Sequence, residues 1–322
     1  MLAFFSFLLL LGRDEDLIGF ANSVIPKEWT ELYGKKDYTD FYRDTRIAFF
    51  QLINFFMMLI FFSFSYKNKF NFDKEIKNLM LLTLFLQFLI TTLQVLVLDQ
   101  ERPTGTLDNS QSVAFLLSII TCYLFMYASG WPKVFLFSLI VLTALLTGTR
   151  SVIAVLVLLY IFNMSFFRNK FALFTTISIA LSSFLITMLL SSSKAIQEIV
   201  LFLVSTATSP LSLNVRFLMW SSFYEVVSRS VLFGTMGIPV YFTDNLFWNF
   251  ILPYGIFGFI FVIFFFGSMI FSIKKNPIFY YFVIVYSVQA ITYSGAFLSN
   301  LAMGLFLLLG YEYSKISATA SQ

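Results

Sequence analysis

Long apolar stretches recur along most of the chain, and they constrain its fold more than any other feature. They cover about residues 1–12, 47–65, 79–98, 112–130, 133–149, 151–167, 171–191, 246–273, 278–294 and 298–311. Most are close to the roughly 20 residues with which an α-helix crosses a bilayer, and they are much longer than the strands of a membrane barrel. The sequence therefore predicts an all-α fold, a polytopic membrane bundle of about ten transmembrane helices, with one domain over residues 1–322.

The composition excludes several classes of protein. Charged residues make up 12% of the chain, against about 25% in a soluble domain. Histidine is absent and Cys122 is the single cysteine, which excludes imidazole-based metal or haem sites and thiolate clusters. There is also no phosphate-binding loop, dinucleotide fingerprint or basic run with interleaved aromatics, so we expect no cofactor, no metal and no nucleic-acid partner.

Basic residues indicate which loops face the cytoplasm. Placing residues 67–77, KNKFNFDKEIK, inside puts most lysines and arginines of the short loops on that side, as the positive-inside rule requires. The inner turns then also contain Asp73, Glu75 and Glu312. Both termini are expected inside, and two longer loops, about 13–46 and 192–245, are expected outside.

One arginine, Arg150, interrupts the apolar stretch LLTGTRSVIAVLVLLYIF at residues 145–162. An arginine keeps its proton in proteins, so a cation at membrane depth is costly and indicates a functional site. The alternative is an arginine at a helix end that extends its side chain to the lipid headgroups. The expected topology puts Arg150 at the outer mouth of the bundle, on the same side as the loop 192–245.

The outer loop 192–245 contains a segment with helical spacing, SPLSLNVRFLMWSSFYEVVSRS, which ends before Gly234. Arg216 lies in its first turns, and Trp220 lies one turn later, where its ring can stack on the guanidinium. We expect an amphipathic helix that lies on the outer face of the membrane or caps the bundle.

A glycine turn and a polar pair precede the eighth apolar stretch. Gly234 and Gly237 predict the turn. Asp244 and Asn245 stand immediately before the stretch, where either is suited to be the N-cap of its helix.

Pro253 and Gly255 inside the eighth stretch predict a kink in its outer third. Tyr254, between them, is a candidate sugar-binding aromatic residue. The alternative for Tyr254 is a place in the interfacial aromatic belt.

The expected outer face thus gathers two arginines, one carboxylate and several aromatic residues. Arginines bind phosphate groups bidentately, and a carboxylate can act as the general base for a hydroxyl group. The pattern predicts transfer of a glycan from a lipid diphosphate on the non-cytoplasmic face. Arg150 and Arg216 would bind the diphosphate, and Asp244 would be the base unless it serves only as a helix cap.

Two segments resemble the O-antigen ligase and O-antigen polymerase (Wzy-like) superfamily, over about residues 145–265. LLTGTRSVIAVLVLLYIF resembles its T-x-S/T-R helix start, and NVRFLMWSSFYEVVSRSVLFGTMGIPVYFTDNLFWNFILPYGIFGFIFVIFF resembles its R-x3-W … P-x-x-G-x-G … H-N-x-[YF]-L … G-[IL]-x-G block. The matching positions are Arg150, Arg216, Trp220, Gly234, Gly237 and Asn245. The resemblance implies that Arg150, Arg216, Trp220 and Asn245 bind substrate and that the two glycines shape the loop.

The resemblance implies a glycosyltransferase of the bacterial inner membrane that works without metal or nucleotide at the periplasmic face. Its donor and acceptor would be undecaprenyl-diphosphate-linked oligosaccharides in membrane lipid, and the arginines would stabilise the leaving diphosphate. Asp244 stands where many members have the histidine thought to serve the acceptor hydroxyl in ligases. This favours a polymerase of repeat units over a ligase. A chain-length regulator protein is a partner implied by the resemblance alone.

Two other classes compete with this interpretation. The acidic run Asp14, Glu15 and Asp16 fits a metal-dependent membrane glycosyltransferase, or simply a charged stop after a short helix; loss of activity in a chelator would favour the former. A transporter or flippase of lipid-linked glycans would also bind a diphosphate with arginines. Transporters often carry internal repeats and paired broken helices, and the sequence has neither.

Overall fold

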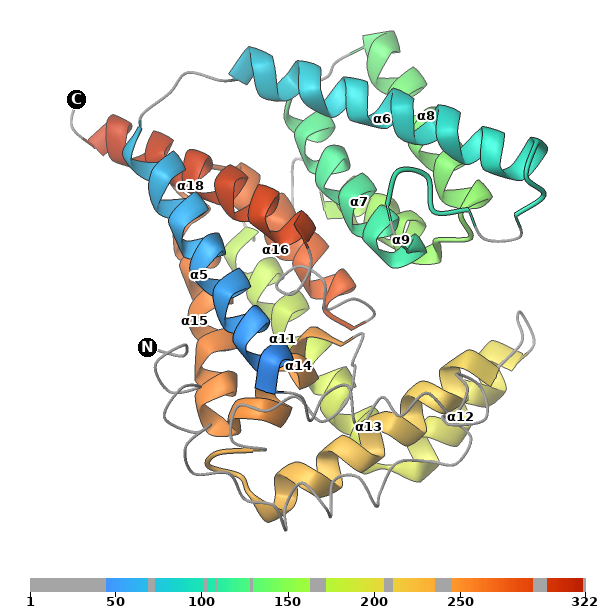
Figure 1. Cartoon of the computed structure of the whole chain (residues 1–322), viewed down its shortest axis with the longest axis vertical. Helices are drawn as coiled ribbons and strands as arrows, with labels where there is room; N and C mark the ends of the chain where they lie inside the picture. Colours follow the sequence, from blue (N-terminus) through green and yellow to red (C-terminus); the bar gives the residue numbers. More distant parts are fainter. Residues whose placement is uncertain are drawn as a thin grey trace. The chain divides into compact units, whose positions relative to one another are not determined.

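The computed structural model describes residues 45–68, 73–100, 103–107, 109–127, 130–162, 172–205, 211–234, 245–291 and 300–320. The described residues contain no strand, which confirms the all-α class (Figure 1). The helices are α5 (Thr45–Lys67), α6 (Asp73–Leu96), α7 (Ser110–Tyr127), α8 (Gly130–Leu146), α9 (Arg150–Phe162), α11 (Ala172–Ser192), α12 (Lys194–Ser205), α13 (Leu211–Arg229), α14 (Leu246–Tyr254), α15 (Ile256–Ser272), α16 (Ile278–Gln289) and α18 (Asn300–Ala320).

The predicted apolar stretches from 47–65 onward coincide with helices. The differences that the structure describes lie at their ends, since α16 ends at Gln289 and α18 continues to Ala320; residues 163–167 lie outside the described residues. The stretch 1–12 and most of the loop 13–46 lie outside the described residues.

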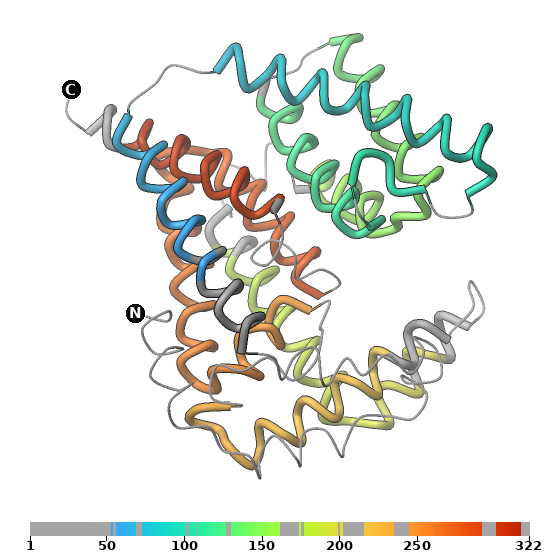
Figure 2. The backbone as a smooth tube through the Cα atoms, in the orientation of Figure 1, coloured from blue at the N-terminus to red at the C-terminus, as the bar shows by residue number. Residues whose placement is uncertain are grey.

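The eighth stretch is divided into α14 and α15 at Gly255, so the predicted kink is confirmed. Pro253 has no N–H to donate within the helix, and Gly255 takes φ 55°, a left-handed conformation that favours glycine. The Gly255 N–H still donates to the Ile251 carbonyl, which closes the last turn of α14. The trace in Figure 2 follows the chain through this break.

The segment 192–245, expected as an outer loop, contains two helices within its described residues rather than one. The helix predicted around Arg216 is α13, and its existence is confirmed. The preceding helix, α12, was not predicted, although Lys194 and Glu198 have the i,i+4 spacing of an exposed helix face. Both of these side chains are exposed.

The chain divides into two compact units, each built from segments distant in sequence. Unit 1 comprises residues 1–56 and 181–265, and unit 2 comprises residues 57–180 and 266–322. The boundaries fall inside α5, α11 and α15. The single domain expected over residues 1–322 stays a prediction.

The core of unit 2 is built around α16, which is buried along almost its whole length. It packs against α7 and α9. The Phe115 and Tyr286 rings lie 5.4 Å apart, and the Tyr123 and Phe282 rings lie 6.1 Å apart. Helix α6 packs on α8 and α7, as Figure 1 shows.

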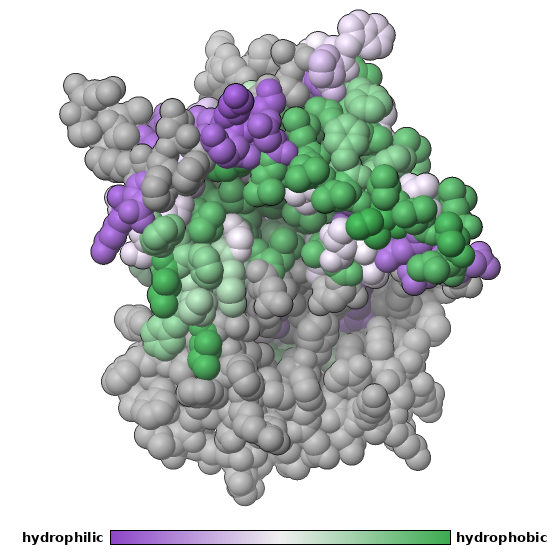
Figure 3. All heavy atoms as spheres, turned by 45° about the horizontal axis from the view of Figure 1, so that its top comes forward, coloured by the Kyte–Doolittle hydropathy of each residue, from purple (hydrophilic) through white to green (hydrophobic). Residues whose placement is uncertain are grey.

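Helix α6 combines an apolar exposed face with polar ends. Among the described residues it is the one helix long and apolar enough to cross a membrane by length and composition. Its 24 residues would span about 36 Å, against about 30 Å of hydrocarbon. Leu82 is 57% exposed and Leu89 is 54% exposed, and Figure 3 shows apolar side chains covering the middle of this helix. The ten-span topology stays a prediction.

Candidate functional site

The start of α14 is fixed by Asn245, which is fully buried. Its side-chain oxygen accepts hydrogen bonds from the backbone N–H groups of Phe247 at 3.0 Å and Trp248 at 3.2 Å. Asn245 is therefore the N-cap of α14 and satisfies two of the N–H groups that have no partner within the helix. Contact between Asn245 and a substrate stays a prediction.

A row of hydroxyl groups on α11 forms hydrogen bonds with the start of α14. Ser183, Thr187 and Ser191 recur every four residues and therefore lie on one face of α11. The Asn245 amide donates to the Thr187 hydroxyl at 3.3 Å, and the Trp248 indole N–H donates to the Ser191 hydroxyl at 3.2 Å. These bonds fix the position of α14 against α11.

Helix α13 packs against α14 through aromatic rings. The Phe223 ring lies 5.9 Å from the Trp248 ring. Arg216 and Trp220 precede Phe223 by seven and three residues, so the three side chains follow one stripe of α13. Trp220 is buried beside Phe217, at 5.8 Å, while Arg216 is partly exposed. Stacking of Trp220 on the Arg216 guanidinium stays a prediction.

Helix α12 is joined to α13 by Gln197, a buried residue that sequence reasoning did not single out. Its side-chain amide donates to the Ser221 hydroxyl at 2.8 Å and to the Leu190 carbonyl at the end of α11. The Ser221 hydroxyl donates in turn to the Phe217 carbonyl at 3.0 Å. This bonding holds the face of α13 that carries Phe217.

The turn after α13 touches the break between α14 and α15. Gly234 takes φ 57°, and a Cβ added there would lie 2.2 Å from the Leu252 carbonyl oxygen. A Cβ on Gly255 would lie 2.4 Å from the Val231 carbonyl oxygen. The Ile256 N–H donates to the same Val231 oxygen at 2.9 Å. Glycine is therefore required on both sides of this backbone contact.

For the other predicted residues of this region, the structure describes only part of what was predicted. Tyr254 is the last residue of α14 and is partly exposed. Gly237 and Asp244 lie outside the described residues. The cap position that Asp244 was a candidate for is occupied by Asn245.

Arg150 is the first residue of α9 in unit 2, and its side chain is exposed. The preceding turn is tight, with Gly148 at φ 67° and the hydroxyl oxygens of Thr147 and Thr149 2.9 Å apart. The Thr149 N–H donates to the Ala144 carbonyl at 2.9 Å, which ties the turn to the end of α8. Arg150 thus lies at a helix end, where its guanidinium adds to the positive N-terminal end of the helix dipole.

Each unit carries an arginine that is suited to binding an anion, and the aromatic residues on the stripe of Arg216 suit an apolar or sugar surface. Unit 1 brings Arg216 and Trp220 onto one stripe of α13 that faces the start of α14, and unit 2 holds Arg150 at the exposed start of α9. Across the described ranges, no group of three or more Asp, Glu, Cys or His side chains is arranged to hold a metal ion.

The residues that sequence reasoning missed here are neutral and buried, namely Ser183, Thr187, Ser191, Gln197 and Trp248. The four-residue recurrence of hydroxyl groups within an apolar segment was a readable signal. Their partners on α14 were not readable, because those residues are more than fifty positions away in sequence.

A scan against protein-family models, a search of curated proteins and a search of solved structures each found no match.

Proposed function

We propose that the chain is a multi-pass protein of the bacterial inner membrane and a metal-independent glycosyltransferase. Its reaction would be the polymerisation of surface polysaccharide, in which undecaprenyl-diphosphate-linked oligosaccharide repeat units are joined at the periplasmic face. The membrane location is supported by the large apolar side chains that are exposed along α6, such as Leu82, Phe85 and Leu89. Exposed apolar surface of this extent is costly in water and favourable in lipid.

The observation that carries the site is the stripe of α13. Arg216 is partly exposed, follows the same helix face as Trp220 and Phe223, and that face meets the capped start of α14. A partly exposed guanidinium on the same helix face as two aromatic rings is suited to bind one phosphate of the donor. Arg150, exposed at the start of α9 in unit 2, is a further candidate cation for phosphate binding.

The proposed reaction transfers the glycan from diphosphate to a hydroxyl. The acceptor hydroxyl oxygen attacks the anomeric carbon of the donor sugar while the bond from that carbon to the diphosphate oxygen breaks. Asp244 takes the hydroxyl proton, and undecaprenyl diphosphate leaves with the bonding electrons. Arg150 and Arg216 stabilise the negative charge that develops on the leaving oxygen.

Complementation of a polymerase-null strain tests the proposal, with the surface glycan read as a ladder on a gel. Wild type should restore the ladder, and Arg150→Ala and Arg216→Ala should abolish it at normal protein levels. Arg229→Ala is the matched control, since Arg229 is an exposed arginine in the last turn of the same helix as Arg216. Because Asn245 is the cap of α14, loss of the ladder in Asp244→Asn would indicate a proton acceptor.

A second assay separates an enzyme from a transporter of lipid-linked glycans. Purified protein is mixed with lipid-linked repeat units, and released undecaprenyl diphosphate is measured over a single turnover. Release by wild type and not by Arg216→Ala supports the glycosyltransferase. Passage of the lipid across vesicles without any release would overturn it.

A further inference from the structure

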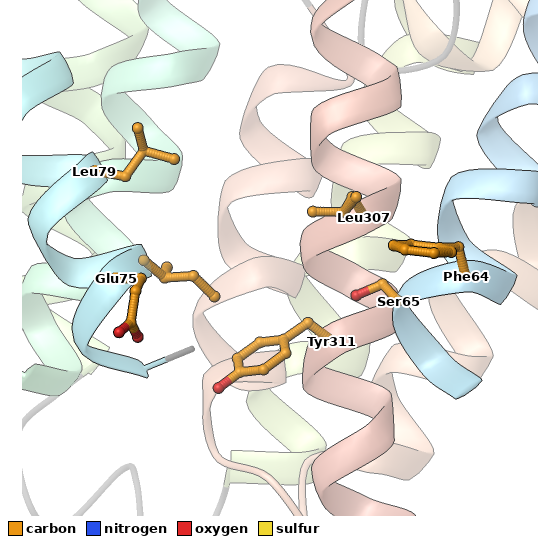
Figure 4. Close-up of a pocket in the computed structure, with 7 residues that line it drawn as sticks. Phe64, Ser65, Glu75, Leu79, Leu307 and Tyr311 are labelled. Atoms are coloured by element: carbon orange, nitrogen blue, oxygen red, sulfur yellow. The ribbon is translucent and has the colours of Figure 1, made fainter. Parts of the chain in front are cut away.

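A cavity lies within unit 2 between the first turns of α6 and the helices α5 and α18. Its volume is about 340 Å³, and Figure 4 shows its lining. Most of its walls are apolar. The lining residues are Phe64 and Ser65 from α5, Glu75, Ile76 and Leu79 from α6, and Leu307 and Tyr311 from α18.

Ser65 is the first sign that the cavity is a binding site. It is 5% exposed, and its hydroxyl points into the cavity (Figure 4). Some other buried hydroxyls of unit 2 donate to a carbonyl four residues earlier, as Ser118 does to Ala114 and Thr121 does to Leu117, both at 2.7 Å in α7. The Ser65 hydroxyl makes no hydrogen bond to any residue that the structure describes. A hydroxyl without a partner in the protein is available to bind a polar group that enters the cavity.

Glu75 is the second sign. Asp73, two residues earlier, is paired with the Lys315 ammonium at 2.6 Å and accepts from the Tyr311 hydroxyl at 3.0 Å. Glu75 lines the cavity instead, and its carboxylate has no ion pair or hydrogen bond within the described ranges. Tyr311 gives its proton to Asp73, so toward the cavity its oxygen can only accept. Glu75 and Tyr311 thus both present acceptors for a donor-rich cation.

Exposed lysines lie close in sequence to the lining residues of the cavity. Lys67 follows Ser65 by two residues, and Lys74 and Lys77 flank Glu75 on the first turns of α6. All three lysine side chains are exposed. An anionic phosphate next to the bound cation would find its counter-charge there. The polar lining of the cavity therefore suits an ammonium, and the lysines near it in sequence offer a counter-charge for a phosphate on the same molecule.

We propose that this cavity binds the ammonium end of an aminophospholipid of the phosphatidylethanolamine class. Its primary ammonium would donate to Glu75, Ser65 and Tyr311, and its phosphate would lie among the lysines. The cavity is at the lower end of the range of about 300–1,000 Å³ for small-molecule sites. The acyl chains therefore extend beyond it, onto the exposed apolar side chains of α6 such as Leu82 and Leu86. The proposal rests on the membrane location proposed above and is independent of glycosyl transfer.

The test is native mass spectrometry of the full-length protein, titrated with single lipids of matched acyl chains. Phosphatidylethanolamine should bind about tenfold more tightly than phosphatidylcholine, whose methylated nitrogen cannot donate, because hydrogen bonds to a charged group are lost. Glu75→Gln should abolish this preference. Leu79→Trp, which enlarges a side chain that lines the cavity, should reduce phosphatidylethanolamine binding, while Leu145→Trp, exposed on α8, should not.

Equal affinity for phosphatidylethanolamine, phosphatidylcholine and phosphatidylglycerol would overturn the proposal. So would an equal effect of the two tryptophan variants, or a preference for undecaprenyl phosphate that Leu79→Trp removes. The glycan ladder provides an independent reading, because Glu75→Gln leaves Arg150 and Arg216 intact. A lost lipid preference with a normal ladder supports the lipid site whether or not polymerisation is the activity.

Discussion

Each unit contains a buried polar network, and the two networks use different chemistry. In unit 1, Asn245, Thr187, Ser191 and Trp248 are neutral and form hydrogen bonds between α11 and the start of α14. In unit 2, the carboxylate of Glu312 is 1% exposed and lies within a set of charged and polar groups. The first network fixes a helix end, and the second joins elements that are far apart in sequence.

The geometry around Glu312 shows how a buried charge is tolerated. Its carboxylate accepts from the Tyr123 hydroxyl at 3.1 Å, the Asn276 amide at 2.8 Å and the Lys315 ammonium at 3.2 Å. Lys315 also pairs with Asp73. The network therefore connects α6, α7, the turn before α16, and α18. When a hydrogen-bond or ion-pair partner is removed in unit 2, a charged carboxylate is left buried without compensation. In unit 1 the same loss leaves only a neutral polar group unpaired. We therefore expect a larger loss of stability when a polar partner is removed in unit 2.

The largest effect is expected for Lys315→Met, which leaves Glu312 buried without its cation. Breaking such a pair should lower the free energy of unfolding by about 3 kcal/mol. Thermal unfolding of the detergent-purified protein measures this. The double variant Lys315→Met/Glu312→Gln should recover most of the loss, because a neutral amide replaces the unpaired charge. A single variant as stable as wild type would mean that Lys315 does not compensate Glu312.

A smaller but still large effect is expected for Gly234→Ala in unit 1. The added Cβ would meet the Leu252 carbonyl oxygen, and alanine is strained at φ 57°. Together these should cost about 2 kcal/mol. Gly304→Ala is the control, because a Cβ there meets nothing within 4 Å. Equal melting temperatures for the two variants would show that the turn after α13 can move away from α14.

The parts of the fold that were predictable are local. Apolar stretches of about 20 residues fix where helices form, and Pro253 with Gly255 fixes the break between α14 and α15. The helix around Arg216 was also predictable from its spacing. Helix α12 was missed because the segment 192–245 was interpreted as a loop with a single helix.

The parts that were not predictable are pairings between distant segments. Glu312 was expected in an inner turn, yet it is buried inside α18 beside Tyr123, 189 positions earlier. No local sequence pattern predicts that pairing, because it depends on how α7 and α18 pack against each other. In the candidate site the residue types of Arg216, Trp220 and Asn245 were readable from the sequence. The capping bonds of Asn245 and its contact with Thr187 were not.

Removing the helix cap should have a moderate effect. Asn245→Ala leaves the N–H groups of Phe247 and Trp248 without an acceptor and should cost about 1 kcal/mol. Asn245→Ser should cost less, because a serine hydroxyl can also cap a helix. If both variants melt together and below wild type, the bond to Thr187 rather than the cap stabilises α14.

The smallest effect is expected for Tyr311→Phe, which is compared with the same substitution beside the buried carboxylate of this network. Tyr311→Phe removes a hydroxyl that donates to Asp73, whose side chain is 51% exposed and keeps Lys315 and water as partners. Its cost should stay below about 0.5 kcal/mol. Tyr123→Phe removes a hydroxyl that donates to the buried Glu312, and its cost should be about 1.5 kcal/mol. Equal losses of stability in the two variants would mean that the charge of the accepting carboxylate, and not its burial, decides how much each hydrogen bond stabilises the protein.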